Sequence, residues 1–363
     1  MKTTPLCKKC ILPENYSGIS FDSNGICNYC NNNMPINYLG AEKLKKDVSK
    51  LLQNATKKSN YDCIVGFSGG RDSTYLLWYV VNVLKLKPLA VFSNSMLIPQ
   101  QTLSNIQKTT TLLGVDLLIK EHNYLKICSK HYLNSWAKYP SPATLITLCT
   151  GCRLGFSEIL YKETIKRKIP FYFTGGTPFE KGYFKKNLIS NKHDHFSFPI
   201  GYIKQVIKNP SLISSIRCLM MLIKEYYLMP KYLSNAKDKP VRISPFYKYL
   251  RWEKEKIEKT IKNELEWERY PGLASSYRGD CEIGVIRQFL YNKFLGYNDK
   301  DDHLSCLIRD NQISREEALR QTEIEKNIKP EILMKAFKKL GFNFNDYITQ
   351  IEINARKHNI LYK

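Results

Sequence analysis

Short apolar runs alternate with longer stretches of helical pattern through the first half of the chain. Four runs have the length and composition of buried strands, at 62–67, 87–93, 115–120 and 170–174. Helices are predicted at 41–55, which is polar and rich in Lys, and at 100–113. Strands separated by helices predict an α/β fold with a doubly wound parallel sheet, right-handed crossovers and ligands at the carboxyl ends of the strands.

The pattern changes at about residue 205, where the chain becomes rich in Lys and aromatic residues and predominantly helical in pattern. One apolar stripe at helical spacing is expected to pack on the sheet domain, with a membrane-surface or partner-docking helix as the alternative: Leu212, Ile213, Ile216, Leu219, Met220 and Ile223. Further along, Ser314 is expected to cap a helix with Glu317 as its capping-box partner.

No apolar stretch in the sequence is long enough for a membrane span. The best candidate, 211–229, is interrupted by Arg217, Lys224 and Glu225. The start of the chain, MKTTPLCKKC, lacks the apolar segment of a secretory signal. We therefore expect a cytoplasmic protein without a transmembrane segment.

The cysteines carry the first chemical signal, because six of the 11 fall into C-x-x-C pairs. Cys7, Cys10, Cys27 and Cys30 have the spacing of a four-thiolate zinc site, and four thiolates leave no open position for catalysis. A segment this short cannot bury enough core by itself, so a structural Zn²⁺ is expected to supply much of its folding free energy. Cys63, within the first strand, is expected to be plain core.

The 363 residues carry 56 Lys and Arg against 33 Asp and Glu, a formal charge of +23. Such a charge suits an anionic partner, but compositional bias explains it equally well, and it does not distinguish nucleic acid from nucleotide or membrane. The organisation predicted is a zinc module at 1–40, a nucleotide-binding domain at 41–205 and a mainly helical region at 206–363.

The segment with the most specific pattern follows the first strand, where Ser68-Gly69-Gly70-Arg71-Asp72-Ser73 leads directly into an apolar helix. A strand, a glycine-rich turn and a helix present backbone N–H groups and a helix N-terminus to phosphate. The two serines add hydroxyl donors, and Asp72 is placed to hold Mg²⁺ or to cap the helix. The loop lacks the lysine and the glycine spacing of kinase and GTPase loops.

This hexapeptide resembles the PP-loop of the N-type ATP pyrophosphatases, whose fold is PP-loop/HUP-like and which split ATP into AMP and pyrophosphate. The resemblance implies that Asp72 and Ser73 are catalytic, that the region after Phe92, with Ser93, borders adenine, and that Gly175-Gly176 closes over the nucleotide. Glu180 is a second candidate Mg²⁺ ligand, with a solvated loop carboxylate as the alternative.

Over nearly the whole chain the sequence resembles the N-acetyl sugar amidotransferases of surface polysaccharide and flagellar glycan biosynthesis. The resemblance rests on CKKCILPE, GISFDSNGICNYC, FSGGRDSTYLL and DDHLSCLIRDNQISREEALR. It implies that ATP adenylates an acetamido oxygen of a nucleotide-linked or acidic sugar, and that ammonia from a separate glutaminase subunit then displaces AMP. His193-Asp194-His195 could contact a substrate phosphate or carboxylate, with a surface loop as the alternative. Candidates for contact with sugar or nucleotide are Arg251-Trp252 and Tyr277-Arg278-Gly279-Asp280-Cys281.

The alternative function is thiolation of tRNA. Sulfur-transferring members of the same superfamily have a C-x-x-C followed by basic residues, as in Cys149-Thr150-Gly151-Cys152-Arg153. A third cysteine would complete a second metal or iron–sulfur site, for which Cys218, Cys281 and Cys306 are candidates, and the positive charge suits tRNA. A structural thiol pair and a redox pair are the alternatives for Cys149 and Cys152. The sequence contains no separate RNA-recognition motif, and its last third matches the sugar enzymes better.

Overall fold

The computed structural model describes residues 4–55, 59–180, 182–189, 197–228, 239–271, 277, 281–326 and 328–360. Its centre is a five-stranded parallel sheet in the order β3-β2-β1-β4-β5. Four strands confirm the predicted runs within one or two residues: β1 (Cys63–Gly66), β2 (Pro88–Asn94), β3 (Leu117–Glu121) and β4 (Phe171–Thr174). The fifth, β5 (Val241–Ile243), was not predicted, because a three-residue edge strand has too few positions to show a period.

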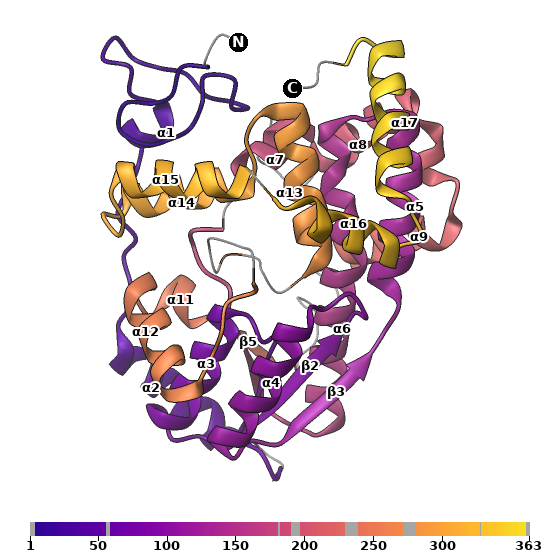
Figure 1. The fold of residues 1–363 in the computed structure, drawn as a ribbon. Helices are drawn as coiled ribbons and strands as arrows, with labels where there is room; N and C mark the ends of the chain where they lie inside the picture. Colours follow the sequence, from indigo (N-terminus) through magenta and orange to yellow (C-terminus); the bar gives the residue numbers. More distant parts are fainter. Residues whose placement is uncertain are drawn as a thin grey trace.

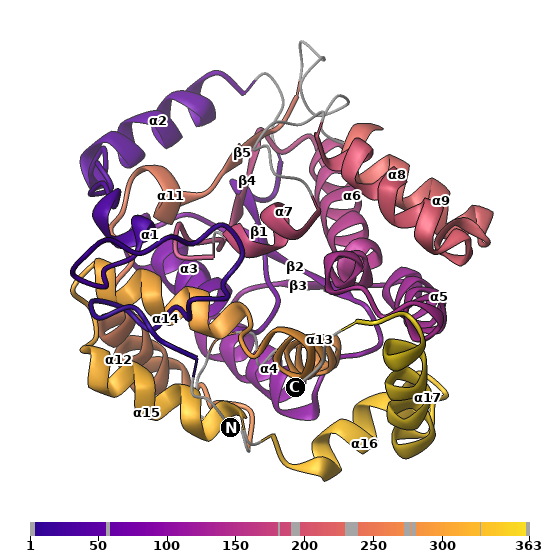
Figure 2. The ribbon, with the colours of Figure 1, turned by 90° about the horizontal axis from the view of Figure 1, so that it is seen from above.

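Helices cover both faces of the sheet, as the prediction of a doubly wound α/β fold requires. Val65 and Phe67 face one core, which they share with Leu76 and Leu77 of α3 (Arg71–Asn82), whereas Ile64 and Val91 face the other core with Leu160. Figure 2 shows the first group of helices on one side of the strands and the second on the other. On the first side lie α2 (Ala41–Gln53), α3, α4 (Gln100–Leu113) and α12 (Lys254–Leu265), and on the second α5 (Tyr124–Lys138), the 3₁₀ helix Pro142–Cys149 and α6 (Thr150–Lys166).

One helical stretch among the described residues, Pro142–Lys166, is long and apolar enough to cross a membrane, and 61% of its apolar window is buried inside the protein. Such burial is typical of a core helix, and α6 packs directly against the sheet. The cytoplasmic location stays a prediction.

The rest of the chain is mainly helical, as predicted, and lies above the carboxyl ends of the strands in the view of Figure 1. Its helices are α7 (Tyr183–Ile189), α8 (Ser197–Lys208), α9 (Ile216–Ile223), α11 (Pro245–Lys248), α13 (Glu282–Leu295), α14 (Asp299–Arg309), α15 (Arg315–Lys326), α16 (Pro330–Lys339) and α17 (Phe344–Lys357). Short helical turns occupy Pro210–Ile213 and Lys224–Leu228. The boundary at 205 stays a prediction, and β5 of the sheet comes from the region beyond it.

The predicted apolar stripe at 212–223 is wrong as a single helical face. Ser215 interrupts it, because its hydroxyl accepts the N–H of Cys218 and begins α9 in a new phase. The buried residues of this segment are Leu212, Cys218, Met221 and Leu222, whereas Ile213, Ile216 and Met220 are exposed. Half of the stripe therefore points into solvent.

The predicted cap at Ser314 is confirmed, since its Oγ accepts the backbone N–H of Glu317 at 3.1 Å. The Glu317 carboxylate instead accepts hydrogen bonds from Arg320 and Gln321 of the next turn. The reciprocal half of the capping box is therefore replaced by side-chain pairs along α15.

Candidate active site at the SGGRDS loop

The two serines of the loop close it into a compact turn. Ser73 Oγ accepts the backbone N–H of Ser68 at 3.2 Å and lies 3.1 Å from both Ser68 Oγ and the carbonyl oxygen of Gly70. Ser68 Oγ in turn accepts the N–H of Gly70 at 3.3 Å. The hydroxyls therefore shape the loop at the N-terminus of α3, where helix N–H groups point toward an anion.

Two glycines permit the close approach of neighbouring segments to this loop. Gly69 has φ +75°, and a Cβ there would lie 2.6 Å from Ile106 and 2.9 Å from the carbonyl oxygen of Thr102. A Cβ on Gly175 would lie 3.0 Å from the backbone nitrogen of Ser73. Gly69 is thus required for backbone conformation, and Gly175 lets the loop after β4 contact the start of α3.

A cavity of about 280 Å³ opens in front of the loop. It lies between β1 and β4, whose last residues, Gly66 and Thr174, are register partners. The strand order reverses at this point, since β2 lies on the other side of β1, and such switch points are where open α/β sheets bind ligands. The cavity is lined by Gly66, Ser68, Gly70, Arg71, Asp72, Ser73, Phe156, Thr174, Gly175, Gly176, Glu180, Arg242 and Tyr277.

Most of the residues predicted from the sequence therefore meet at one cavity, although their roles stay predictions. Phe92 and Ser93 do not line it. Phe92 is buried in the core, and Ser93 Oγ is 3.0 Å from Nε2 of His122, which is held against Gly155 of α6. Burial lowers the pKa of His122, so its ring is expected to be neutral.

Arg71, which lies in the loop predicted to bind pyrophosphate, lines the cavity, and its guanidinium contacts protein groups. Its Nε donates to Asp72 at 2.9 Å, and its Cζ lies 4.5 Å above the ring of Trp252. Glu258 is 3.8 Å away on another side. The side chain is only 2% exposed. Arg71 thus anchors the loop to the segment before α12, and its contact with pyrophosphate stays a prediction.

Asp72 does not cap α3, because Gly70 occupies the N-cap position. Its Oδ1 accepts hydrogen bonds from Arg71 and from the indole N–H of Trp252, the latter at 2.9 Å. Trp252 is fully buried, so the predicted contact of this tryptophan with sugar or nucleotide is wrong. Arg251, its neighbour, is exposed and contacts Asp310.

Arg242 of β5 lines the cavity, although no motif in the sequence points to it. Its Nε donates to Thr174 Oγ1 at 3.2 Å, and within the described part of the chain it has no carboxylate partner. A guanidinium beside a glycine-rich loop and without a competing carboxylate is suited to hold phosphate oxygens. It went unnoticed because nothing in the local sequence marks 241–243 as a strand of this sheet.

Tyr277 also lines the cavity, where its ring stacks on His303 of α14 with centroids 4.2 Å apart and planes 5° apart. This agrees in place with the predicted contact at Tyr277, and Cys281 lies just before α13. Arg278, Gly279 and Asp280, and likewise His193, Asp194 and His195, lie outside the described residues.

The donor set fits a hydrated Mg²⁺, because the carboxylates of Asp72 and Glu180 both line the cavity beside the loop. These are the hard oxygen ligands that this ion prefers in phosphate-binding sites. The assignment of both residues to Mg²⁺ stays a prediction.

The four N-terminal cysteines converge as predicted. Their sulfur atoms all lie within 4.8 Å of one another, with Cys7 and Cys30 4.0 Å apart and Cys10 and Cys27 3.7 Å apart. All four are buried, and Cys7 Sγ accepts the backbone N–H groups of Cys10 and Cys27. The geometry and the donor set fit a tetrahedral metal, and Zn²⁺ is the predicted ion.

Arginines from the C-terminal region surround this cysteine module. Arg315 of α15 donates to the carbonyl oxygens of Cys7 and Cys10 at 3.0 to 3.3 Å. Arg309 is half-buried beside Cys306, whose sulfur accepts its Nη2 at 3.0 Å. A site of four thiolates and one Zn²⁺ carries two negative charges, which these cations complement. Through Arg315, the stretch QISREEALR at the start of α15 therefore holds this helix against the module (Figure 1).

Cys149 and Cys152 lie at the start of α6, and Cys149 Sγ accepts a hydrogen bond from Nη1 of Arg287 at 2.6 Å. Arg287 is itself paired with the buried Asp299 at 2.8 Å. Within the described ranges, the N-terminal module is the one group of three or more side chains placed to bind a metal. Cys218, a predicted third ligand, is instead hydrogen-bonded to Cys128, which lowers its pKa to about 6. A second metal site at Cys149 and Cys152 stays a prediction.

Residues 264–363 match the family described as LPS biosynthesis protein WbpG-like, C-terminal domain. The C-terminal region is therefore WbpG-like. This match confirms the resemblance to surface-polysaccharide enzymes in the region that supplies α13, α14 and α15. The same chain carries the SGGRDS loop and its cavity at the switch point of the sheet.

Comparisons with other known proteins cover most of the chain at low sequence identity. The uncharacterised protein MJ1599 of Methanocaldococcus jannaschii is 24% identical over 326 residues, which cover 89% of this chain and 94% of that protein. Similar structures include the U34-tRNA thiolase NcsA of Methanococcus maripaludis (15% identity, TM-score 0.34, 93% of this chain and 89% of that chain). The NMN synthetase of Francisella tularensis has 11% identity and a TM-score of 0.37 and covers 80% and 95%. Because these TM-scores are low, the assignment of the fold rests on the strand order observed in this protein.

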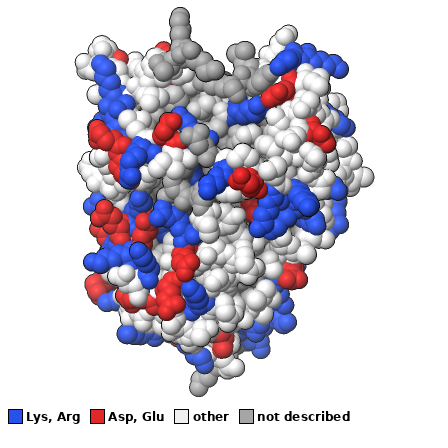
Figure 3. All heavy atoms as spheres, viewed as in Figure 1, with Lys and Arg blue, Asp and Glu red and all other residues white. Residues whose placement is uncertain are grey.

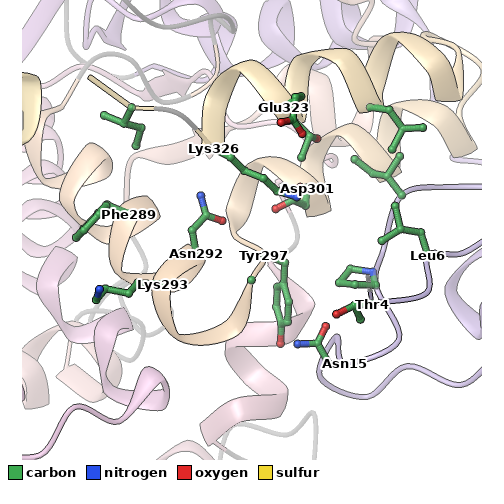
Figure 4. A pocket seen from close by; sticks show the side chains of 16 residues that line it. Thr4, Leu6, Asn15, Phe289, Asn292, Lys293, Tyr297, Asp301, Glu323 and Lys326 are labelled. Carbon is green, nitrogen blue, oxygen red and sulfur yellow. The ribbon is translucent and has the colours of Figure 1, made fainter. Parts of the chain in front are cut away.

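The positive charge of the protein does not gather into one stripe on the face seen in Figure 3, where basic and acidic side chains are intermixed. A second cavity, of about 650 Å³, lies between the N-terminal module and α13 to α15 (Figure 4). None of the residues predicted to bind ATP lines it.

Proposed function

We propose that the protein uses ATP to adenylate the acetamido group of an N-acetylated, nucleotide-linked or acidic sugar and then replaces the amide oxygen with ammonia. The observation that carries the proposal is the coincidence of an SGGRDS loop cavity at the β1/β4 switch point with a WbpG-like C-terminal region in one chain. The first feature suits activation by ATP, and the second suits a substrate from polysaccharide synthesis.

In the proposed reaction the acetamido oxygen attacks the α-phosphorus of ATP, and the bond to the bridging oxygen breaks to release pyrophosphate. The resulting imidoyl adenylate has AMP as its leaving group. Ammonia adds to the same carbon and loses a proton, and AMP departs with the original oxygen to leave an acetamidino group. Activation is needed because an amide oxygen alone is a poor leaving group.

The chain's own groups suit the first step. The N–H groups at the start of α3 and the Arg242 guanidinium converge on the cavity, where negative charge develops on pyrophosphate. Mg²⁺, held by Asp72 and Glu180, would supply further stabilisation of this charge. Arg71 and Trp252 hold the Asp72 carboxylate in place.

The sugar, its glutaminase partner and Zn²⁺ in the cysteine module are parts of the same proposal. The protein would take ammonia from a separate subunit, as the resemblance implies. The module would act structurally, because its four buried thiolates leave no position for a substrate.

The test uses the purified chain with ATP, Mg²⁺, ammonium and candidate N-acetylated nucleotide sugars whose acetyl oxygen carries a heavy isotope. Mass spectrometry should find exchange of O for NH in the sugar and the heavy oxygen in AMP. Release of unlabelled AMP would contradict the proposed attack by the acetamido oxygen. Incorporation of sulfur into tRNA, with no change in any sugar, would instead support the thiolation alternative.

A further inference from the structure

Two helices on the outer edge of the molecule present apolar side chains to solvent. On α8, Ile200, Ile203 and Ile207 are 59%, 58% and 74% exposed. On α9, Ile216 and Met220 are 78% and 53% exposed. Figure 2 shows both helices at the periphery, beyond α5 and α6. The spacing of the isoleucines places them along one side of α8. We call this side of α8, together with the exposed face of α9, the α8–α9 surface.

The two helices are anchored in the same buried core. Tyr132 of α5 donates a hydrogen bond to the carbonyl oxygen of Cys218 in α9 at 3.4 Å. Tyr202 of α8 and Cys218 are buried in the same cluster as Tyr132. Because both helices bury the side that faces this core, the exposed residues of both lie on the side away from it.

The charges on this surface are all of one sign. From Ser197 to Lys224 the chain has four basic residues and no acidic residue. Lys204 and Lys208 lie among the exposed isoleucines of α8, and Arg217 follows Ile216. Within the described residues, Lys204 and Lys208 have no carboxylate partner, whereas Lys224 pairs with Glu158 at 3.0 Å.

We infer that the α8–α9 surface binds the surface of an anionic phospholipid bilayer. Exposed aliphatic side chains interleaved with lysines are typical of helices that lie in the membrane interface, with isoleucine among the acyl chains and lysine at the headgroups. A protein partner fits less well, because lysine is depleted and aromatic residues are enriched at protein interfaces. This inference is independent of the proposed reaction.

Flotation with lipid vesicles tests the inference on the full-length protein. We expect binding to vesicles rich in phosphatidylglycerol, little binding to pure phosphatidylcholine, and weaker binding as salt is raised. The double variant Lys204→Gln/Lys208→Gln should reduce the bound-to-free ratio about thirtyfold. The triple variant Ile200→Ser/Ile203→Ser/Ile207→Ser should abolish binding.

A matched control replaces three exposed isoleucines elsewhere, in Ile119→Ser, Ile165→Ser and Ile353→Ser, and should keep vesicle binding. Unchanged thermal unfolding of the Ile200/Ile203/Ile207 variant would show that loss of binding is not loss of folding. Equal binding to neutral and anionic vesicles, or none to either, would overturn the inference. A dimer of the parent chain in light scattering would also overturn it, if the Ile200/Ile203/Ile207 variant were a monomer. The surface would then bind a second copy of the chain.

Discussion

The hydroxyl of Tyr16 in the cysteine module donates a hydrogen bond to the buried carboxylate of Asp302 in α14, over 2.8 Å. The other oxygen of Asp302 accepts the backbone N–H of Gly182, also at 2.8 Å. Gly182 follows Glu180 of the cavity by two residues. The module, α14 and the loop after β4 are thus joined through one carboxylate.

Replacing Tyr16 by Phe should lower the free energy of unfolding by about 1 to 3 kcal/mol, because a buried carboxylate loses a donor. Burial already raises the pKa of Asp302, which indicates how poorly the charge is solvated. Urea unfolding measures the change. The control Tyr227→Phe, at an exposed ring, should change stability by less than about 0.5 kcal/mol. Equal changes in the free energy of unfolding of the two variants would show that the hydrogen bond from Tyr16 to Asp302 does not stabilise the protein.

Arg242 and Arg71 should respond differently to substitution. Arg242→Met should weaken pyrophosphate binding about tenfold or more by calorimetry and leave thermal unfolding nearly unchanged, because the side chain is exposed and points into the cavity. Arg71→Met should lower the free energy of unfolding by about 3 kcal/mol, because it leaves the Asp72 carboxylate without its ion pair. A destabilised Arg242 variant with unchanged pyrophosphate affinity would argue against its proposed role.

Gly69→Ala should disturb the loop more than an equivalent change at another glycine with positive φ. Its Cβ would press on Ile106 and on the backbone of Thr102. Gly114→Ala is the matched control, because Gly114 has φ +61° and open space around it. Both variants should lose roughly 1 kcal/mol from backbone strain, and only Gly69→Ala should also lose pyrophosphate binding. Binding retained by Gly69→Ala would contradict the loop assignment.

Metal analysis should find about one Zn²⁺ per chain, held by the cysteine module. Cys10→Ser should lose the metal and unfold at lower temperature, since hydrogen bonds from Arg315 alone cannot hold the module. Cys149→Ser should keep it. Loss of iron from Cys149→Ser would instead establish a second metal site at Cys149 and Cys152 and favour the thiolation alternative.

Stability should fall below about pH 6.5 in part because of His122. Burial depresses its pKa in the folded protein below the ordinary value of 6.5. As the pH falls through 6.5, the unfolded chain therefore takes up a proton before the folded protein does. The free energy of unfolding falls between pH 6.5 and the lower pKa of His122 in the folded protein. His122→Gln should flatten the decline in urea midpoint between pH 7.5 and pH 5.5 relative to the parent protein. The surface variant His358→Gln should not, and an identical decline in both would contradict the assignment.

Local sequence determined the elements whose signals are contiguous. The strands β1 to β4, α4, the phosphate loop and the four-cysteine spacing were predicted because each depends on neighbouring residues and on periods of 2 or 3.6. The N-cap at Ser314 was found for the same reason. At 212–223 the same reasoning failed, because a single capping serine resets the helical phase and local hydrophobicity alone cannot show it.

Tertiary structure decided which residues meet. Arg242 reaches the cavity only because β5 joins the sheet beside β4, and Arg71 is anchored only because Trp252, far along the chain, lies under its guanidinium. Arg315 belongs to a motif whose local role is a helix start, yet it binds the cysteine module. Contacts between residues far apart in sequence depend on how the layers pack, and the amphipathic pattern of each element constrains only which face is buried.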